Sequence, residues 1–310
     1  MQKTDNNLKT VLVLFSFKKN KIADYEDVIR KLNERAPEYG YKVVRGATKE
    51  LEFSIIDNKP SVFETLTGQD LANFDLVFYR MWQKEFERAT SAAIYLKSKG
   101  VPFFDEDVYN YRAFSKLTET FLMVTSGVPV PNSYFSTAKN TIKSFKENPP
   151  IDFPLIVKNI RGLKGKDNYL VHSNEELEKV LENNSEIDFV VQEFIPNNCD
   201  YRFLVLGDKV KLIIKRSRLD DSSHLNNTSQ GAGAELVPIE NFDKQIINDV
   251  LKASKVMKRD FTGVDVIINK ETGKHYLLEV NNVPEIISVF IEEKVTSIHE
   301  YIAERLKNEK

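Results

Sequence analysis

The sequence is poor in the residues that form covalent or metal cross-links. Its 310 residues include one cysteine, Cys199, and four histidines that are scattered along the chain. A single cysteine excludes a disulfide within the chain and any zinc cluster built from cysteines. The scattered histidines disfavour a histidine-based metal site. The composition therefore fits a protein of the reducing cytoplasm.

Long hydrophobic runs are also missing. The first apolar run, residues 11–17, is too short for the apolar core of a signal peptide or for a membrane span, and a polar segment precedes it. No later stretch approaches the length that a membrane helix needs. We therefore expect a cytoplasmic protein with no membrane partner.

The chain has no strong charge of one sign. Its 44 basic and 46 acidic residues leave a formal net charge of -2, so no overall field favours nucleic acid or an anionic membrane. Hydrophobic residues make up 41% and charged residues 29%, which is ordinary for a globular protein. This length predicts two or three domains. Partners must be inferred from individual sites, and no nucleic acid is expected among them.

The first hundred residues alternate short apolar runs with helical patterns. The run 11–17 is followed by apolar residues at helical spacing, and further runs occur at 41–44, 76–79 and 101–104. This alternation predicts a small parallel sheet that is covered by helices. No Gly-x-Gly-x-x-Gly motif follows the first run, which argues against NAD or FAD.

Three side chains of this region are candidates for ligand contact. Arg80, Trp82 and Arg112 follow apolar runs, and an open α/β sheet binds its ligands beyond the carboxyl ends of its strands. The alternative for each is a helix cap or a surface residue.

Residues 108–127 are then predicted to form a helix that ends at a glycine followed by prolines.

The most informative stretch lies near the C-terminal end. Residues 263–268 and 276–282 indicate two apolar strands around a polar turn that contains glycine, the pattern of a β-hairpin. In antiparallel pairing Asp265 lies nearly opposite Glu279, and Asn281 points to the same face as Glu279. Carboxylates among apolar residues need a cation or hydrogen-bond donors, so these residues predict a magnesium site. The alternative is a pair of acids that bind nearby lysines or arginines, or lie at the wet ends of their strands.

Two loops between strands are further candidates. The basic loop 159–168 contains two glycines and can place backbone N–H groups and lysines over a polyphosphate, with an ordinary basic turn as the alternative. The polar loop 219–234 has no core-forming pattern, and its length indicates a functional flap. Ser173 and Glu176 form a capping box, which is a structural feature.

Several motifs, taken in order, resemble one known family. Residues from about 110 to 310 resemble the ATP-grasp fold and, within it, the RimK-type and glutathione-synthetase-like carboxylate–amine ligases. The motifs are Lys116 ahead of Gly127-Val128-Pro129-Val130-Pro131, the strand 153–158 that ends in Lys158, the hinge Gln192-Glu193-Phe194-Ile195, Asp200-Tyr201-Arg202, Lys215-Arg216, the loop with Asn227 and Gly231, and Gly263-Val264-Asp265 with Glu279-Val280-Asn281. Seven motifs in this order do not arise by coincidence.

The resemblance implies an α/β protein, with an α+β arrangement inside the ATP-grasp part. Residues 1–107 would form an N-terminal parallel α/β domain, the pre-ATP-grasp domain, on the substrate side. Residues 108–195 would form the small lid subdomain with the hinge, and residues 196–310 the C-terminal subdomain that carries the metal and catalytic groups. The two subdomains would enclose ATP. The first hundred residues match no motif of the family.

The resemblance also implies the nucleotide and metal contacts. ATP is expected with Mg²⁺, or alternatively Mn²⁺, and with two ions. The metal ligands would be Asp265, Glu279 and Asn281. The nucleotide contacts would be Lys116 and Lys158 on the phosphates with Gly162 in the phosphate loop, the backbone of Gln192, Glu193, Phe194 and Ile195 at adenine, Glu193 or Asp200 at the ribose, and Asn227 at metal or phosphate.

The implied activity is that of an ADP-forming ligase, which makes an amide bond through an acyl phosphate. Arg202 and Arg216, with Lys215, would be the catalytic donors, and an exposed ion pair is the alternative for each arginine. The substrate would be an amino acid, a small peptide, or a side chain or terminus of a protein. The alternatives are an ATP-binding regulatory or scaffold protein and an ATP-grasp kinase.

Two departures from the family's pattern are visible. The loop 161–168 contains fewer glycines than the loops that it resembles, and Gln230 stands where the RimK-type pattern is basic. The second departure indicates a different acceptor. Neither the two substrates nor the oligomeric state, with a homo-oligomer among the alternatives, follows from these residues.

Overall fold

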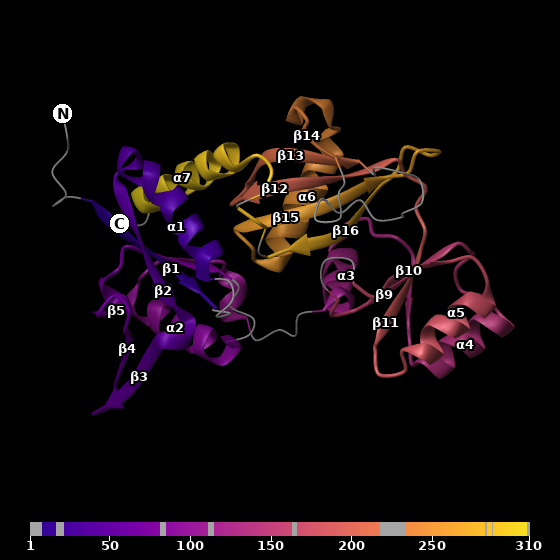
Figure 1. Cartoon of the computed structure of the whole chain (residues 1–310), viewed down its shortest axis with the longest axis horizontal. Coiled ribbons are helices and arrows are strands. Elements are labelled where there is room, and N and C mark those ends of the chain that lie inside the picture. The colour runs from indigo at the N-terminus through magenta and orange to yellow at the C-terminus, as the bar shows by residue number, and fades with distance from the viewer. Residues whose placement is uncertain are drawn as a thin grey trace.

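The computed structural model describes residues 8–16, 22–80, 85–110, 115–162, 166–217, 233–282, 284–286 and 288–308. These residues form four sheets with helices packed against them. Figure 1 shows an N-terminal unit at one end of the molecule, a small unit with α4 and α5 at the other end, and the largest sheet between them. The short 3₁₀ helices are Ala36–Tyr39, Thr48–Glu50, Leu71–Asn73, Glu106–Tyr109 and Ile239–Asn241.

A parallel sheet with the order β2-β1-β6-β7 is the centre of the N-terminal unit. The central strand β1 is buried on both faces, because Val11 and Val13 lie in one apolar core and Leu12 and Leu14 in another. This arrangement confirms the predicted parallel sheet between helices. The elements are β1 (Lys9–Phe15), α1 (Ile22–Arg35), β2 (Tyr41–Ala47), β6 (Leu76–Arg80), α2 (Phe86–Lys99) and β7 (Phe103–Phe104).

A second, antiparallel sheet projects from this unit in a region that the sequence pattern did not assign. It consists of β3 (Leu51–Ile56), β4 (Lys59–Glu64) and β5 (Gln69–Asp70) in the order β3-β4-β5. Ile55 and Ile56 are 78% and 67% exposed although they point to opposite faces. Apolar residues on both exposed faces remove the alternation by which a half-buried strand is predicted.

The small unit is an antiparallel sheet with the order β10-β9-β11-β8, covered by two helices whose apolar residues share one core with the strands. Its elements are β8 (Ser133–Phe135), α4 (Ala138–Glu147), β9 (Leu155–Asn159), β10 (Asn168–Val171), α5 (Asn174–Asn183) and β11 (Phe189–Glu193). The predicted cap of α5 is confirmed, since Ser173 Oγ accepts the Glu176 N–H at 3.3 Å.

The helix that precedes this unit is shorter than predicted. α3 (Lys116–Thr125) begins after Ser115, whose hydroxyl accepts the Thr118 N–H at 3.2 Å and so caps the first turn. The prediction of a helix from residue 108 was therefore wrong at its start. Its predicted end is confirmed, because Gly127 adopts a positive φ of 73° directly after the helix.

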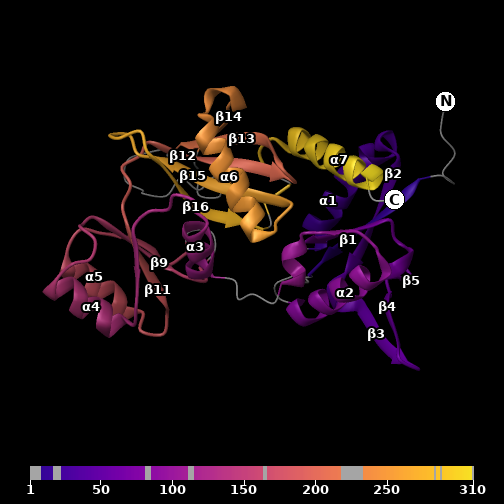
Figure 2. The ribbon, with the colours of Figure 1, turned by 180° about the vertical axis from the view of Figure 1, so that it is seen from behind.

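The largest sheet has the order β14-β13-β12-β15-β16 and is antiparallel throughout. Its β15–β16 pair confirms the predicted hairpin, with Asp265 opposite Glu279. The elements are β12 (Cys199–Leu206), β13 (Lys209–Ser217), β14 (Gly233–Leu236), α6 (Lys244–Met257), β15 (Phe261–Ile268), β16 (His275–Asn281) and α7 (Ile291–Asn308). α6 covers this sheet, whereas α7 lies beside α1 in both views (Figures 1 and 2).

The N-terminal unit and the largest sheet are joined by buried polar contacts. The Asp105 carboxylate accepts the N–H groups of Asp260 and Phe261 at 2.7 and 2.8 Å, directly where β15 begins. α7 adds apolar residues such as Ile298 and Ile302 to the core of the N-terminal unit. These contacts fix β15, and with it Asp265, relative to the parallel sheet. No helix among the described residues is long and apolar enough to cross a membrane.

Candidate functional site

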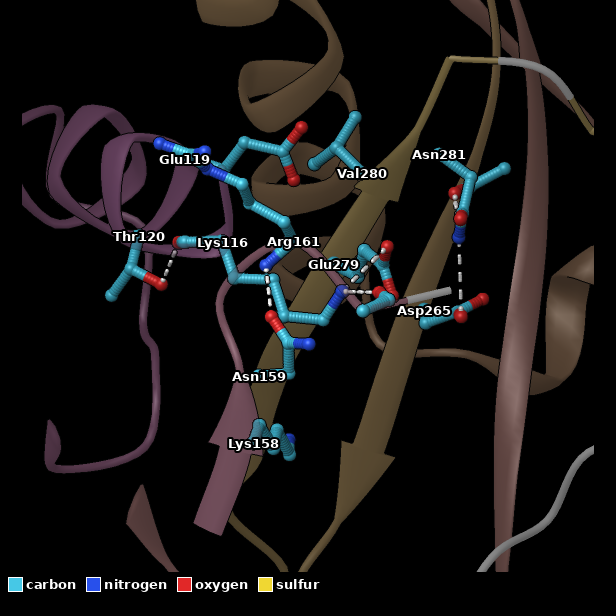
Figure 3. Close-up of polar contacts among 12 residues, drawn as sticks. Lys116, Glu119, Thr120, Lys158, Asn159, Arg161, Asp265, Glu279, Val280 and Asn281 are labelled. Atoms are coloured by element: carbon cyan, nitrogen blue, oxygen red, sulfur yellow. Dashed lines mark hydrogen bonds and ion pairs between the residues drawn. The ribbon is translucent and has the colours of Figure 1, made fainter. Parts of the chain in front are cut away.

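The three predicted metal ligands lie together on β15 and β16. Figure 3 shows Asp265, Glu279 and Asn281 on these neighbouring strands, with Lys116 reaching toward Glu279 from α3. Asn281 donates through Nδ2 to Asp265 Oδ2 at 3.2 Å. No group of three acidic, histidine or cysteine side chains fit for a metal occurs in the described part of the chain. A metal here would bind two carboxylates and an amide, which suits a hard ion whose remaining oxygen ligands come from phosphate.

Two arginines neutralise Asp265. Arg202 binds it with Nε and Nη2, each at 2.7 Å, and Arg216 Nη2 lies 3.2 Å from Oδ2. Burial alone would raise the pKa of Asp265, but the two guanidinium groups outweigh it and lower the pKa to about 2. Gly263 gives Arg202 room, because a Cβ there would lie 3.2 Å from the Arg202 Cδ.

Arg216 is also paired with Asp200. Its Nε and Nη2 donate to the two Asp200 oxygens at 2.6 and 2.8 Å, and both residues are buried. Burial raises the pKa of Asp200 to about 6, although Arg216 opposes the rise. The Asp200 carboxylate is thus engaged by Arg216, and its expected contact with ribose stays a prediction.

Lys215 lies apart from this cluster. Successive strand residues point to opposite faces, so Lys215 faces away from Arg216. Its ammonium binds Glu235 on β14 at 2.6 Å. Its expected catalytic part stays a prediction.

The two predicted nucleotide lysines approach the acidic pair from α3 and β9. Lys116 Nζ donates to the Gly162 carbonyl at 2.7 Å and lies 3.5 Å from Glu279 Oε1. Lys158 Nζ donates to Gln192 Oε1 at 2.8 Å. Burial lowers the pKa of Lys158 to about 8; the Glu279 charge opposes this, and the Lys116 charge adds to it.

The predicted hinge, which begins within β11, is held by a residue that sequence reasoning missed. Asn132 donates to the Glu193 carboxylate through its backbone N–H at 3.0 Å and its side-chain amide at 2.9 Å. The Phe194 N–H donates to the Pro154 carbonyl, and the Ile195 carbonyl accepts from Asn197. A lone asparagine after a proline-rich turn carries no signal of this role. The contacts of these hinge residues with adenine stay predictions.

Three sequence candidates, Trp82, Arg112 and Asn227, lie outside the described residues. A fourth candidate, Arg80, is described. Arg80 is buried, donates to the Pro284 carbonyl at 2.9 Å and lies over the ring of Phe261. Burial lowers its pKa to about 10. Arg80 therefore ties the end of β6 to the segment that follows β16.

A second residue that sequence reasoning missed is Arg259, between α6 and β15. It is buried and binds Asp107, Glu119 and the Val280 carbonyl. The run Lys258-Arg259-Asp260 indicates only a polar turn, because the partners come from distant segments.

Positive charge exceeds negative charge in this site. The cations are Lys116, Lys158, Arg202 and Arg216, and the acids are Asp200, Asp265 and Glu279. A basic excess around two facing carboxylates suits a polyphosphate that binds with a divalent metal ion.

Comparison with known proteins identifies the family. A family model described as the RimK-like ATP-grasp domain matches residues 113–305, which is more than half of the chain. The chain belongs to the RimK-like ATP-grasp family. The match covers the acidic pair and the cations around it, and it leaves out Arg80, Trp82, Asp107 and Arg112.

Individual relatives of this ATP-grasp chain agree with that assignment. It is 26% identical over 259 residues to a protein of Psychromonas ingrahamii named probable alpha-L-glutamate ligase, covering 82% of this chain and 83% of that one. A solved structure of the ATP-grasp ligase PsnB with a minimal precursor covers 97% of this chain and 99% of its own, at 18% identity and a TM-score of 0.68. A RiPP-associated ATP-grasp ligase of Chryseobacterium gregarium, with ADP and a leader and core peptide, covers 98% of both chains at 15% identity and a TM-score of 0.68.

These findings confirm three predictions. The resemblance to RimK-type ATP-grasp proteins, the α/β fold and the class of ATP-grasp ligase are all confirmed. ATP and Mg²⁺ are typical of the family, and one PsnB structure holds Mg and ADP.

Proposed function

We propose that this ATP-grasp chain is an ADP-forming carboxylate–amine ligase that makes an amide bond through an acyl phosphate. The observation that carries the proposal is the gathering of four cationic side chains around two facing carboxylates, Asp265 and Glu279. Joining a carboxylate to ATP brings two anions together, so a site for this reaction needs such an excess of positive charge.

The nucleotide lies between the small unit and the largest sheet in this proposal. Lys116 and Lys158 contact the phosphates, and the close turn at Gly162 lets backbone approach them. A Cβ at Gly162 would lie 2.8 Å from the Lys166 carbonyl oxygen, so the turn requires glycine. The backbone of residues 192–195 faces adenine, Glu193 or Asp200 faces the ribose, and Asn227 assists at the metal or phosphate. The proposed domain boundaries, after residues 107 and 195, separate the substrate side, the lid and the metal-binding part.

The donors on β15 and β16 fit a magnesium ion. Asp265, Glu279 and Asn281 would hold it, and it would supply positive charge to the phosphate oxygens of ATP. Two ions are proposed, and Mn²⁺ is the alternative metal. Lys116 and Arg202 balance the charges of the two carboxylates from positions beside the proposed phosphate site.

The proposed reaction has two steps. A carboxylate oxygen of the substrate attacks the γ-phosphorus of ATP, the bond to the bridging oxygen breaks, and ADP leaves. An amine then attacks the acyl carbon, phosphate leaves, and the nitrogen loses a proton to give the amide. Arg202 and Arg216 stabilise the oxyanion as donors that are already in place. Lys215, which faces away from Arg216, would join them only after leaving Glu235.

The substrate class is an amino acid, a peptide, or a side chain or terminus of a protein. Relatives named for L-glutamate and neighbours solved with precursor peptides support L-glutamate and carboxylate-bearing peptides as the first compounds to test. A cytoplasmic location stays a prediction, and a homo-oligomer stays one alternative for the oligomeric state.

The test is ADP release by the full chain with ATP and Mg²⁺ across L-glutamate, other amino acids and peptides, with product masses read in parallel. A mass gain of one amino acid minus water supports ligation. A gain of one phosphate instead supports a kinase, and nucleotide binding without turnover on any compound supports a scaffold. The Glu279→Gln variant serves as the control for release that does not come from this site.

A further inference from the structure

We propose that Arg259 is a positioning residue that fixes Lys116 against Glu279 and thereby sets the affinity for the magnesium nucleotide. The inference rests on the proposed function only in assuming that ATP binds at this site. Arg259 itself lies behind the site and is not assigned any contact with the nucleotide.

One buried guanidinium joins three segments that the site brings together. Arg259 Nε lies 3.0 Å from Asp107 Oδ2 at the end of the N-terminal unit, and Nη2 lies 3.0 Å from Glu119 Oε1 on α3. Nη1 donates to the Val280 carbonyl on β16. The side chains of Arg259, Asp107 and Glu119 are 2%, 0% and 15% exposed, so water competes little for these bonds.

Two of the three partners of Arg259 lie close in sequence to site residues. Glu119 is three positions after Lys116 on α3, so both side chains lie on one side of the helix. Val280 stands between Glu279 and Asn281, two of the proposed metal ligands. Figure 3 shows Glu119 and Lys116 on the helix, with Val280 and Glu279 on the adjacent strand. Arg259 therefore sets the spacing between the helix that carries Lys116 and the strand that carries Glu279.

The chemistry of arginine suits this task. Its donors form a rigid planar fork, so three bonds to one guanidinium fix the relative positions of all three partners. α3 is held at its start by a different unit, because the Lys116 N–H donates to the Ile160 carbonyl at 2.9 Å. Arg259 ties the same helix to β16, because it binds Glu119 on α3 and the Val280 carbonyl on β16. This link supports the 3.5 Å approach of Lys116 to Glu279.

Glu119→Asp is the sharpest test. It keeps a negative charge near Lys116, but its side chain is too short for the carboxylate to contact Arg259. We expect the Kd of the full chain for Mg·ADP, measured by titration calorimetry, to rise about tenfold, the usual scale for groups that orient metal and phosphate ligands. Arg259→Lys should weaken binding to a similar extent, because an ammonium lacks the planar fork. Thermal unfolding of each variant confirms that the chain is folded during the titration.

Asp107→Asn is the matched control, because it removes the other carboxylate from the same guanidinium without touching α3. We expect it to lower the melting temperature and to leave the Kd within about twofold of the wild type. Unchanged affinity in Glu119→Asp, or an equal loss in Asp107→Asn, overturns the inference. Wild-type binding without any ligation product contradicts the proposed function alone, whereas a wild-type chain that binds no Mg·ADP overturns both.

Discussion

The Lys158 ammonium donates to the amide oxygen of Gln192 at 2.8 Å, and the Gln192 amide in turn donates to Ser133 Oγ at 3.0 Å. A neutral amide orients the ammonium without cancelling its charge, so the charge is available to a phosphate. The same surroundings make that charge costly, because Lys158 is partly buried and lies near a second lysine.

Nucleotide affinity should therefore depend on pH through Lys158. Burial lowers the pKa of Lys158 to about 8, so the free chain loses this charge as the pH rises through that value. Phosphate favours the charged form, so binding is strong below this pKa and weakens above it. We expect the Kd for Mg·ADP to rise about tenfold from about pH 7 to about pH 9, in calorimetric titrations at constant ionic strength.

Lys158→Arg separates this cause from others. A guanidinium stays charged over the whole range, so the variant's Kd should vary less than about twofold over the same pH interval, whatever its absolute value. A variant that keeps the wild-type pH profile would show that another group titrates, and would contradict the assignment.

The facing acids Asp265 and Glu279 should be required for metal-dependent turnover. We expect Asp265→Asn combined with Glu279→Gln to reduce Mg²⁺-dependent ADP release by at least about 100-fold, because both proposed carboxylate ligands are lost. Circular dichroism should show an intact fold. Glu271→Gln, which removes an exposed acid from the turn of the same hairpin, should have wild-type turnover. Wild-type turnover in the double variant would refute the site assignment.

The sequence could predict those parts of the site that lie on single elements. Alternation along residues 263–282 places Asp265 opposite Glu279, because a strand repeats every two residues and the turn sets the register. The strand that carries Lys158 is predictable from the short apolar run that precedes the lysine. Local patterns also gave the end of α3 at Gly127, where only a residue that tolerates positive φ fits.

The remaining parts depend on contacts between distant segments. Arg259 meets Asp107 and Glu119 across 152 and 140 residues of chain, and Asn132 meets Glu193 across 61. No local period encodes such pairs, since any of these polar residues could equally face water. Family resemblance did not reveal them either, because it was drawn from motifs that these residues lie outside.

Gly162→Ala should disturb the proposed phosphate loop. An added Cβ would lie 2.8 Å from the Lys166 carbonyl oxygen and 3.0 Å from the Asn159 Cβ, so the turn must shift and move the Gly162 carbonyl away from Lys116. We expect a loss of about 1–3 kcal/mol in the free energy of unfolding and weaker binding of Mg·ADP. Gly233→Ala is the control, since its Cβ would meet only the Ser217 carbonyl at 4.0 Å. Equal effects of the two substitutions would contradict the prediction.

Arg216 and Arg202 should differ in their effect on stability although both bind Asp265. Removing Arg216 leaves the buried Asp200 carboxylate without its guanidinium, whereas removing Arg202 leaves Asp265 still bound by Arg216. We expect Arg216→Met to lower the free energy of unfolding by about 3–5 kcal/mol, the scale for breaking a buried ion pair on one side. The Arg202 side chain is 26% exposed, so Arg202→Met should lower the free energy of unfolding by only about 1 kcal/mol.

Urea denaturation of the two variants measures this difference, and a third variant tests its cause. Adding Asp200→Asn to Arg216→Met removes the orphaned charge, so the double variant should regain at least about 1 kcal/mol over Arg216→Met. Turnover should stay low in it, because Arg216 is also a proposed oxyanion donor. If Asp200→Asn restores nothing, the cost of Arg216→Met arises from lost packing around the arginine and not from an unpaired carboxylate.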